Sequence, residues 1–204
     1  MKITENIVSA VTEVYQKKRM PVVGIDGLGG AGKSTVAEKV CEELTEKGIH
    51  TILLHADDFI HPRAVRYDDS YPEWECYYKV QWRYDYFIDL INTAKRSPDN
   101  ISAELYDKEN DSYNTVTYPI RRNTVIIVEG IFLQRNELDG VFDYMVYLDV
   151  PEAVRLGRVL ERDTYIGDSD SITEKYENRY FPAERRYVRE YHPESSADLV
   201  LRES

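Results

Sequence analysis

A glycine-rich segment at residues 27–35 constrains this chain more than any other feature. Its sequence is Gly-Leu-Gly-Gly-Ala-Gly-Lys-Ser-Thr, which fits the phosphate-binding pattern G-x-x-x-x-G-K-[ST]. An apolar run at 21–25, typical of a buried parallel strand, precedes it, and a helical pattern at 34–47 follows. Glycines let the backbone turn its N–H groups inward, and the N-terminus of the helix adds partial positive charge. This order predicts that the chain binds a nucleoside triphosphate.

Two side chains of this segment have the chemistry that a bound triphosphate requires. Lys33 can reach the β- and γ-phosphates, and the hydroxyl of Ser34 can bind Mg²⁺. We therefore expect the nucleotide to contact the whole loop, namely Gly27, Gly29, Gly30, Ala31, Gly32, Lys33, Ser34 and Thr35.

Apolar runs alternate with helical patterns along the rest of the chain. Strands are expected at 51–54, 124–128, 144–148 and 199–201, and helices at 3–14, 80–95, from 151 onward and at 171–191 with a break near Pro182. Two short strands at 101–106 and 114–118 indicate an antiparallel hairpin. The alternation predicts an α/β fold, a five-stranded parallel sheet with helices on both faces, in a single domain spanning 1–204.

Charge and hydropathy limit the kinds of partner and the cellular location that we expect for this protein. The net charge of −11 argues against a nucleic-acid-binding surface. The N-terminus lacks the apolar core of a signal peptide, and no apolar run reaches membrane-spanning length. The histidines at 50, 55, 61 and 192 have no metal-ligand spacing and are interpreted as non-catalytic. We expect a cytoplasmic protein with a small-molecule substrate and no nucleic-acid or membrane partner; a homo-oligomer is compatible with the sequence.

Acidic residues follow two of the predicted strands. Glu129 comes after the most apolar run in the chain, where a carboxylate would face Mg²⁺ directly or through water. Asp57 and Asp58 follow the strand at 51–54 and should lie on the same rim as the glycine-rich loop. Asp57 is the preferred general base, with Asp58 as its rival. A solvated acid after a strand is the alternative interpretation of Glu129.

Three arginines are spaced by three and four residues within the helix that starts near 151. Arg155, Arg158 and Arg162 should therefore share one helical face. They predict a lid at about 152–170 that closes over the triphosphate, although a face exposed to solvent would show the same spacing.

The stretch from 61 to 78 is too long for a plain connection and rich in aromatic residues, which favours a functional loop or partial lid. Its arginines, Arg63 and Arg66, would suit an anionic ligand, whereas its tyrosines would suit a neutral nucleoside.

Taken in order, these motifs resemble the uridine kinase and phosphoribulokinase family from about residue 22 to 201. The segments that carry the likeness are 25–35, Asp57-Asp58-Phe59, Tyr106-Asp107, 128–131, and 148–163 with its three arginines. The resemblance implies a P-loop NTPase fold and an ATP- and Mg²⁺-dependent kinase of a small-molecule hydroxyl. It also implies that Asp57 is the base and that Tyr106 lies near the acceptor.

The predicted function is transfer of the γ-phosphoryl of ATP to uridine or a related nucleoside. Ile60 stands where uridine kinases commonly have a tyrosine, so pantothenate, a nicotinamide riboside or a phosphosugar stay open as acceptors. A non-catalytic nucleotide-binding switch is the alternative of another class. We predict that catalysis depends on Asp57, Lys33, Arg158 and Arg162, and that ATP is bound by the loop and Arg155. The acceptor is expected to contact Asp58, Phe59, Arg63 and Tyr106. The predicted Mg²⁺ ligands are Ser34, Asp57 and Glu129.

Overall fold

Five parallel strands form the central sheet of the computed structural model, which describes residues 2–97 and 99–203. In sheet order they are β2 (His50–His55), β5 (Thr124–Gly130), β1 (Val22–Gly27), β6 (Tyr144–Asp149) and β7 (Leu199–Arg202). The two central strands β1 and β5 are buried along their whole length, as their continuous apolar runs require. The predicted five-stranded parallel sheet is confirmed.

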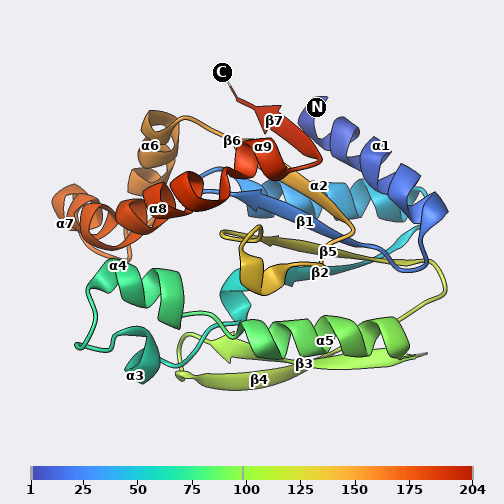
Figure 1. Ribbon diagram of the computed structural model, residues 1–204, viewed down its shortest axis with the longest axis horizontal. Coiled ribbons are helices and arrows are strands. Elements are labelled where there is room, and N and C mark those ends of the chain that lie inside the picture. The colour runs from blue at the N-terminus through green and yellow to red at the C-terminus, as the bar shows by residue number, and fades with distance from the viewer. Residues whose placement is uncertain (1, 98, 204) are drawn as a thin grey trace.

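Helices cover both faces of this sheet (Figure 1). On one face, helices α1 (Lys2–Lys17) and α2 (Lys33–Glu46) pack their apolar stripes on side chains such as Val23 and Ile25. On the other face, α5 (Tyr84–Arg96) and α8 (Phe181–Tyr191) pack on alternate residues of the same strands, such as Val22 and Ile126. The alternation of strand side chains divides the core into these two halves.

A separate antiparallel hairpin lies beside α5, at the bottom of Figure 1. It pairs β3 (Asn100–Asp107) with β4 (Ser112–Pro119), and the buried side chains of β3 join the core beneath α5. The predicted hairpin is confirmed. Its turn reaches the end of the molecule at which the carboxyl ends of the parallel strands also lie.

The stretch after β2 is more ordered than a loop. A 3₁₀ turn (Ala56–Asp58) is followed by the short helices α3 (Arg63–Arg66) and α4 (Glu73–Glu75) and a π-helical turn (Cys76–Val80). The helix expected from 80 begins only at Tyr84, because Trp82 is buried and pairs its backbone with Ile60. This bridge fixes both ends of the segment against the core.

The C-terminal third is mostly helical. It contains a 3₁₀ turn (Asn136–Leu138), α6 (Glu152–Arg162), α7 (Ser169–Lys175), a π-helical turn (Tyr176–Tyr180), α8 and α9 (Pro193–Ser196). The π-helical turn ends at Tyr180, two residues before Pro182, which has no N–H to donate and would crowd a regular preceding turn. No helix among residues 2–97 and 99–203 is long and apolar enough to cross a membrane.

Candidate active site

The glycine-rich loop joins β1 to α2 at the carboxyl edge of the sheet. Gly30 has a φ of +80°, and a Cβ at this position would lie 2.7 Å from the Arg155 carbonyl oxygen, so only glycine fits. Gly32 caps α2 without a side-chain hydrogen bond. The N–H groups of the first helical turn therefore keep no acceptor within the helix and can bind an anion. The Lys33 ammonium folds back to donate to the Leu28 carbonyl at 3.1 Å.

Glu129 lies at the centre of a small polar cluster at the end of β5. Ser34 Oγ donates to Glu129 Oε1 at 3.1 Å, and His55 Nδ1 lies 2.6 Å from the same oxygen. Burial by itself would raise the pKa of Glu129, but the hydrogen bond from His55 and the charge of Lys33 outweigh burial and lower that pKa below its ordinary value. The hydrogen bond to Glu129 in turn raises the pKa of His55. The site therefore keeps Glu129 ionised.

Asp57 lies beside this cluster, whereas its neighbour Asp58 does not line the cavity. Asp57 is exposed where it lines the cavity, but the cavity walls displace part of the water around its carboxyl, and this loss of hydration, with the charge of Glu129, raises its pKa against the opposing charge of Lys33. A carboxylate with a raised pKa accepts a proton more readily. Between the two adjacent aspartates, the geometry favours Asp57.

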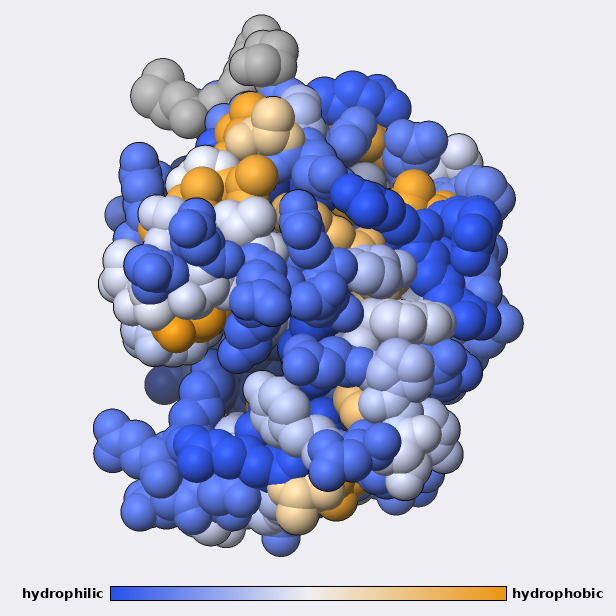
Figure 2. All heavy atoms as spheres, turned by 90° about the vertical axis from the view of Figure 1, so that its left-hand side faces the viewer, coloured by the Kyte–Doolittle hydropathy of each residue, from blue (hydrophilic) through white to orange (hydrophobic). Residues whose placement is uncertain are grey.

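One cavity of about 330 Å³ collects these groups. Figure 2 faces this end of the molecule and shows a mostly hydrophilic surface hollowed between an upper and a lower part. Residues from the loop, the strand ends, the segment after β2, the hairpin and the C-terminal helices all line it. Among them are Gly29, Gly30, Lys33, Ser34, Asp57, Arg63, Tyr106, Lys108, Glu129, Arg162, Arg179 and Glu184.

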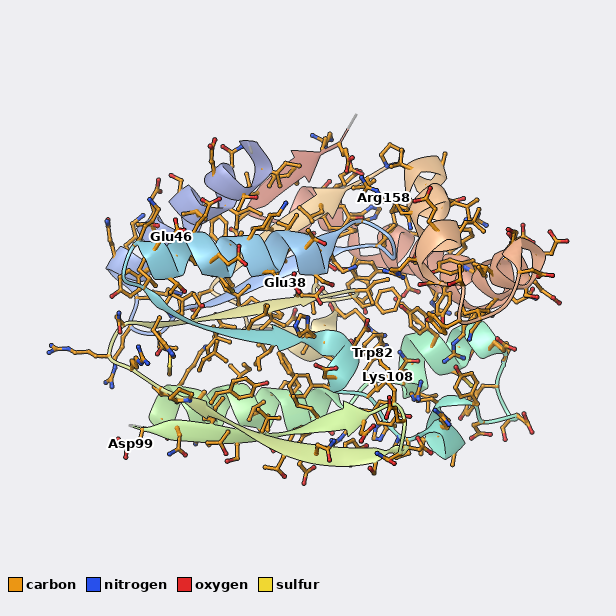
Figure 3. The ribbon with its side chains drawn as sticks, turned by 180° about the vertical axis from the view of Figure 1, so that it is seen from behind. Glu38, Glu46, Trp82, Asp99, Lys108 and Arg158 are labelled. Atoms are coloured by element: carbon orange, nitrogen blue, oxygen red, sulfur yellow. The ribbon has the colours of Figure 1, made fainter. Side chains whose placement is uncertain are left out.

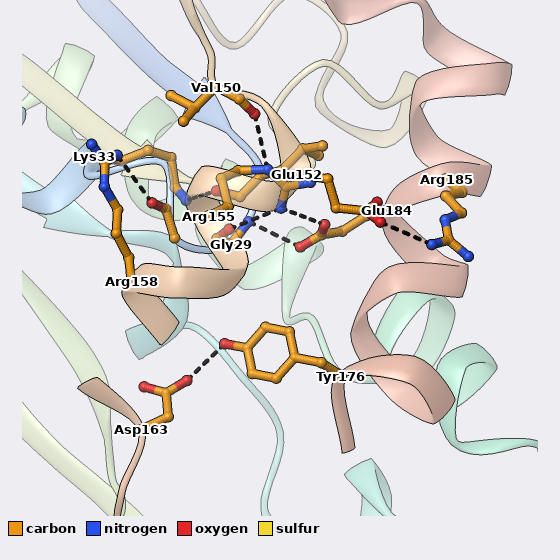
Figure 4. A network of polar contacts seen from close by, with 12 residues as sticks. Gly29, Lys33, Val150, Glu152, Arg155, Arg158, Asp163, Tyr176, Glu184 and Arg185 are labelled. Carbon is orange, nitrogen blue, oxygen red and sulfur yellow. Dashed lines mark hydrogen bonds and ion pairs between the residues drawn. The ribbon is translucent and has the colours of Figure 1, made fainter. Parts of the chain in front are cut away.

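Arg155 does not face this cavity, which corrects its prediction as an ATP ligand. Its side chain is 3% exposed and forms a buried ion pair with Glu184 at 2.8 Å (Figure 4). Arg155 Nη1 also donates to the Gly29 carbonyl at 2.9 Å, while the Gly29 N–H donates to Glu184 Oε1 at 2.9 Å. The ion pair is thus hydrogen-bonded to both the carbonyl and the N–H of Gly29, which fixes the position of this part of the loop.

The other two arginines of α6, Arg158 and Arg162, line two different cavities. Arg162 lines the main cavity and is oriented by hydrogen bonds to Asp163. Arg158 lies near the start of α2 in Figure 3, donates to the Gly30 carbonyl at 3.4 Å, and pairs with Glu203. It lines a second hollow of about 330 Å³ that also includes the loop residues Ala31, Gly32 and Thr35. The three arginines expected on one face are thus divided among three environments.

Of the predicted acceptor residues, the structure brings two to the cavity. Arg63 and Tyr106 line it. Phe59 does not, and its prediction is wrong: its side chain is 3% exposed and packs edge-on against Phe87 in the core, with ring centroids 5.1 Å apart. Its place next to Asp57 in the sequence does not decide its direction, because the 3₁₀ turn points successive side chains to different sides.

Sequence reasoning missed several residues that the fold brings to the site. His55 pairs with Glu129 through the register of β2 and β5, although its spacing carried no metal-binding signal. Glu184 and Arg179 come from a C-terminal stretch with no recognisable motif, more than 140 residues after the loop. The position of His55 at a strand end was the one signal that could have identified it.

The model of the phosphoribulokinase / uridine kinase family matches residues 22–203. The chain belongs to this family. It is therefore a kinase with a P-loop nucleotide-binding fold. Similar family members include a uridine kinase from Staphylococcus haemolyticus, 28% identical over 190 residues, which cover 89% of this chain and 87% of that protein. A uridine kinase from Leuconostoc citreum is 28% identical over 143 residues, covering 70% and 68% of the two chains.

Solved structures of similar proteins share the fold of this chain. A structure described as a possible uridine kinase from Bacillus stearothermophilus matches 98% of this chain and 100% of its own with a TM-score of 0.78 and 30% identity. D-glycerate 3-kinase from Cryptococcus neoformans has a TM-score of 0.66 at 12% identity, covers 89% of this chain and 87% of its own, and shares the fold alone. These similarities establish the family and its fold, at identities too low to carry over an acceptor.

Proposed function

We propose that this protein transfers the γ-phosphoryl of ATP to a hydroxyl group of a small molecule. The observation that supports it is the convergence of Lys33, Ser34, Asp57 and Glu129 on one cavity at the carboxyl edge of the sheet. Phosphoryl transfer needs positive charge on the phosphates, a metal site and a group that orients or deprotonates the acceptor. These four residues supply all three.

The donor nucleotide would lie across the glycine-rich loop. Its phosphates would accept hydrogen bonds from the loop and the first turn of α2, with Lys33 and Arg162 balancing charge from two sides of the cavity. The hollow beside Arg158 adjoins the outer side of the same loop and is lined largely by apolar groups such as Val150 and Leu201, which suits the nucleoside part of ATP.

The oxygen groups at the strand ends fit Mg²⁺. Ser34 Oγ and Glu129 Oε1 lie 3.1 Å apart, and Asp57 lines the same cavity. Mg²⁺ prefers such oxygen donors and takes its remaining ligands from water and phosphate. Bound there, it would neutralise charge that develops on the transferring phosphoryl group. Among the described residues, there is no cluster of three or more His, Cys, Asp or Glu side chains that could hold a metal ion. Mg²⁺ would therefore depend on water and phosphate for its remaining ligands.

Asp57 would accept the proton of the acceptor hydroxyl as that oxygen attacks the γ-phosphorus. The bond between the γ-phosphorus and the bridging oxygen breaks, and ADP leaves with the bonding electrons. The raised pKa of Asp57 supports this role. The relatives named as uridine kinases make uridine the first acceptor to test, and it stays a prediction.

A coupled assay of ADP release tests this function. Purified protein with Mg²⁺ and ATP is given nucleosides, vitamins, sugars and sugar phosphates one at a time. We expect at least one acceptor to raise ADP release well above the rate without acceptor. If the protein binds ATP but no acceptor stimulates release, the non-catalytic switch becomes the better interpretation.

A further inference from the structure

One wall of the cavity carries four cationic side chains that form no ion pairs with other described residues. This cationic wall consists of Arg63, Arg66, Lys108 and Arg179, which come from α3, the hairpin turn and the π-helical turn before α8. In Figure 3, Lys108 lies at the tip of the hairpin, close to these elements. None of the ion pairs between described residues includes any of the four.

The carboxylates that line the cavity belong to other parts of it. Asp57 and Glu129 lie at the strand ends, and Glu184 is paired with Arg155 behind the glycine-rich loop. Asp163 is paired with Arg162. The charge of Lys108 acts on Asp57, and the charges of Arg63 and Arg66 act on Asp111 beside the hairpin turn, but none of the four cations forms an ion pair with these acids.

Arg66 is 9% exposed and is held by neutral groups. Its Nε donates to the His61 carbonyl at 2.6 Å, and its Nη2 donates to the Tyr106 hydroxyl at 2.8 Å. The Tyr106 hydroxyl donates in turn to Asp111 Oδ1 at 2.6 Å. Asp111 is thus hydrogen-bonded to Arg66 through Tyr106 and not directly, and this chain of hydrogen bonds fixes the direction of the guanidinium without an ion pair.

Arg179 is buried more deeply, at 1% exposure. It donates to the carbonyls of Glu73 and Arg66 and to Gln81 Oε1, at 3.2, 3.4 and 3.0 Å. The ring of Tyr67 lies 4.3 Å from its guanidinium carbon. All these partners are neutral. They can orient a buried charge but cannot cancel it, and a buried charge without a counter-ion is strongly disfavoured.

We propose that this wall binds an anionic group, a carboxylate or a phosphate, carried by the acceptor. The inference rests on the proposed kinase function and narrows its acceptor to an anionic small molecule with a free hydroxyl. Guanidinium groups match both oxyanions in geometry, and the bound anion would supply the missing counter-charge. A neutral nucleoside would leave the wall uncompensated.

Related acceptors with and without an anionic group test this proposal. Glycerol is compared with D-glycerate and glycerol 3-phosphate, ribose with ribonate and ribose 5-phosphate, and uridine with uridine 5′-phosphate, each with ATP and Mg²⁺. We expect kcat/KM for at least one anionic member to exceed that of its neutral counterpart by about tenfold or more, as hydrogen bonds to charged groups imply. The carboxylate and phosphate arms identify which anion is preferred.

Substitutions in the cationic wall test whether its residues cause the preference for an anionic acceptor. Arg179→Gln removes the buried charge, and Lys108→Ala removes a charge that is exposed on a turn, so it should fold normally. Arg185→Gln and Lys79→Ala are matched controls, because both are exposed cations outside the cavity lining. We expect the first two variants to lower kcat/KM for the anionic acceptor several-fold more than for the neutral one, and the controls to change neither.

The outcomes are distinguishable. A neutral acceptor phosphorylated as well as its anionic partners, or a charge preference that both cavity variants leave intact, would overturn this inference while the kinase function stands. Equal losses for all acceptors in both variants would assign the wall a purely structural role and also overturn it. If ATP binds and no acceptor of either charge reacts, the proposed function itself fails.

Discussion

Asp57 and Asp58 are adjacent residues with different surroundings. Asp57 lines the cavity with Lys33 and Glu129, whereas Asp58 lies outside that lining, where the charge of His55 acts on its carboxyl. At the scale of single residues, the direction of a side chain decides its role more than its position in the chain does. Of the two carboxylates, only Asp57 lines the cavity in which we propose that the acceptor binds.

Asp57→Asn should lower kcat by about a hundredfold or more, because the acceptor hydroxyl loses its proton acceptor. The affinity for ATP should stay close to that of the wild type. Steady-state kinetics and a nucleotide-binding titration measure the two effects separately. Asp58→Asn is the matched control, for which we expect at most a few-fold change. Near-normal turnover of Asp57→Asn would argue against it as the base.

At the scale of elements, helix α6 shows how one amphipathic face can serve two purposes. Arg155 points down onto the glycine-rich loop and Glu184, and its burial makes it part of the framework. Arg158, less than one turn further on, is 39% exposed and faces a hollow. The regular helical spacing of these arginines therefore does not show that one is part of the buried framework and that another faces a hollow, where we propose that it contacts the nucleotide.

Arg155→Met should reduce the free energy of unfolding by about 3–5 kcal/mol, because it leaves Glu184 buried without its partner. Arg158→Ala should change stability by roughly 0.5 kcal/mol or less but lower kcat/KM about tenfold or more. Urea denaturation and steady-state kinetics of both variants provide the comparison. In the double variant with Glu184→Gln, part of the stability lost in Arg155→Met should return. Loss of stability in Arg158→Ala alone would reverse this assignment.

Asp143 connects several elements at the opposite edge of the sheet. It accepts hydrogen bonds from Lys18 Nζ at 2.8 Å, after α1, and from the Val22 N–H at 2.9 Å, at the start of β1. Burial opposes its ionisation, but Lys18, the Val22 N–H and Lys95 outweigh burial, so the pKa of Asp143 lies below its ordinary value. Its stabilising contribution is therefore present above about pH 4, the unfolded pKa, and is lost as pH falls through the lower folded pKa.

Asp143→Asn should thus lower the free energy of unfolding at pH 7 by about 1–3 kcal/mol. The difference from the wild type should shrink as the pH is lowered from about 4 through the folded pKa. Denaturation curves collected across that range measure it. Asp139→Asn is a control, since Asp139 is an exposed acid in the same region. A difference that does not depend on pH would contradict the ionic origin of the effect.

At the scale of the whole molecule, charge is unevenly distributed. The chain carries a net charge of −11, yet the cavity is lined by seven lysines and arginines and four carboxylates. A cationic recess in an acidic protein favours anionic ligands locally. The cavity also lies between elements from both ends of the chain, so a ligand bound there should stabilise the entire fold.

A non-hydrolysable ATP analogue with Mg²⁺, at about a hundred times its Kd, should stabilise the protein by about 2.7 kcal/mol. For a chain of this length that corresponds to a rise in Tm of roughly 5–10 °C. Thermal unfolding followed by circular dichroism measures the shift, and the same analogue with EDTA should give a clearly smaller one. An equal shift without the metal would argue against Mg²⁺ binding at Ser34 and Glu129.

Much of the fold followed from local patterns. The glycine-rich loop, the five strands and the hairpin each depend on residues adjacent in sequence, and the order of strands and helices leaves few topologies open. Predicted residues at strand ends, such as Asp57 and Glu129, reached one cavity because parallel strands end at the same edge. Phe59 and Arg155 departed from prediction because spacing does not specify which side of a turn or helix is buried.

The sequence alone predicted the loop at which we propose that a triphosphate binds, because the strand, loop and helix of that site are contiguous and the family motifs follow in order. Only the tertiary structure decided what surrounds it. The hydrogen bond from the Gly29 N–H to Glu184 connects residues more than a hundred positions apart, and Arg179 lines the same cavity as the distant glycine-rich loop. Such contacts arise from packing α8 and the π-helical turn against the loop and α3, which no local pattern encodes.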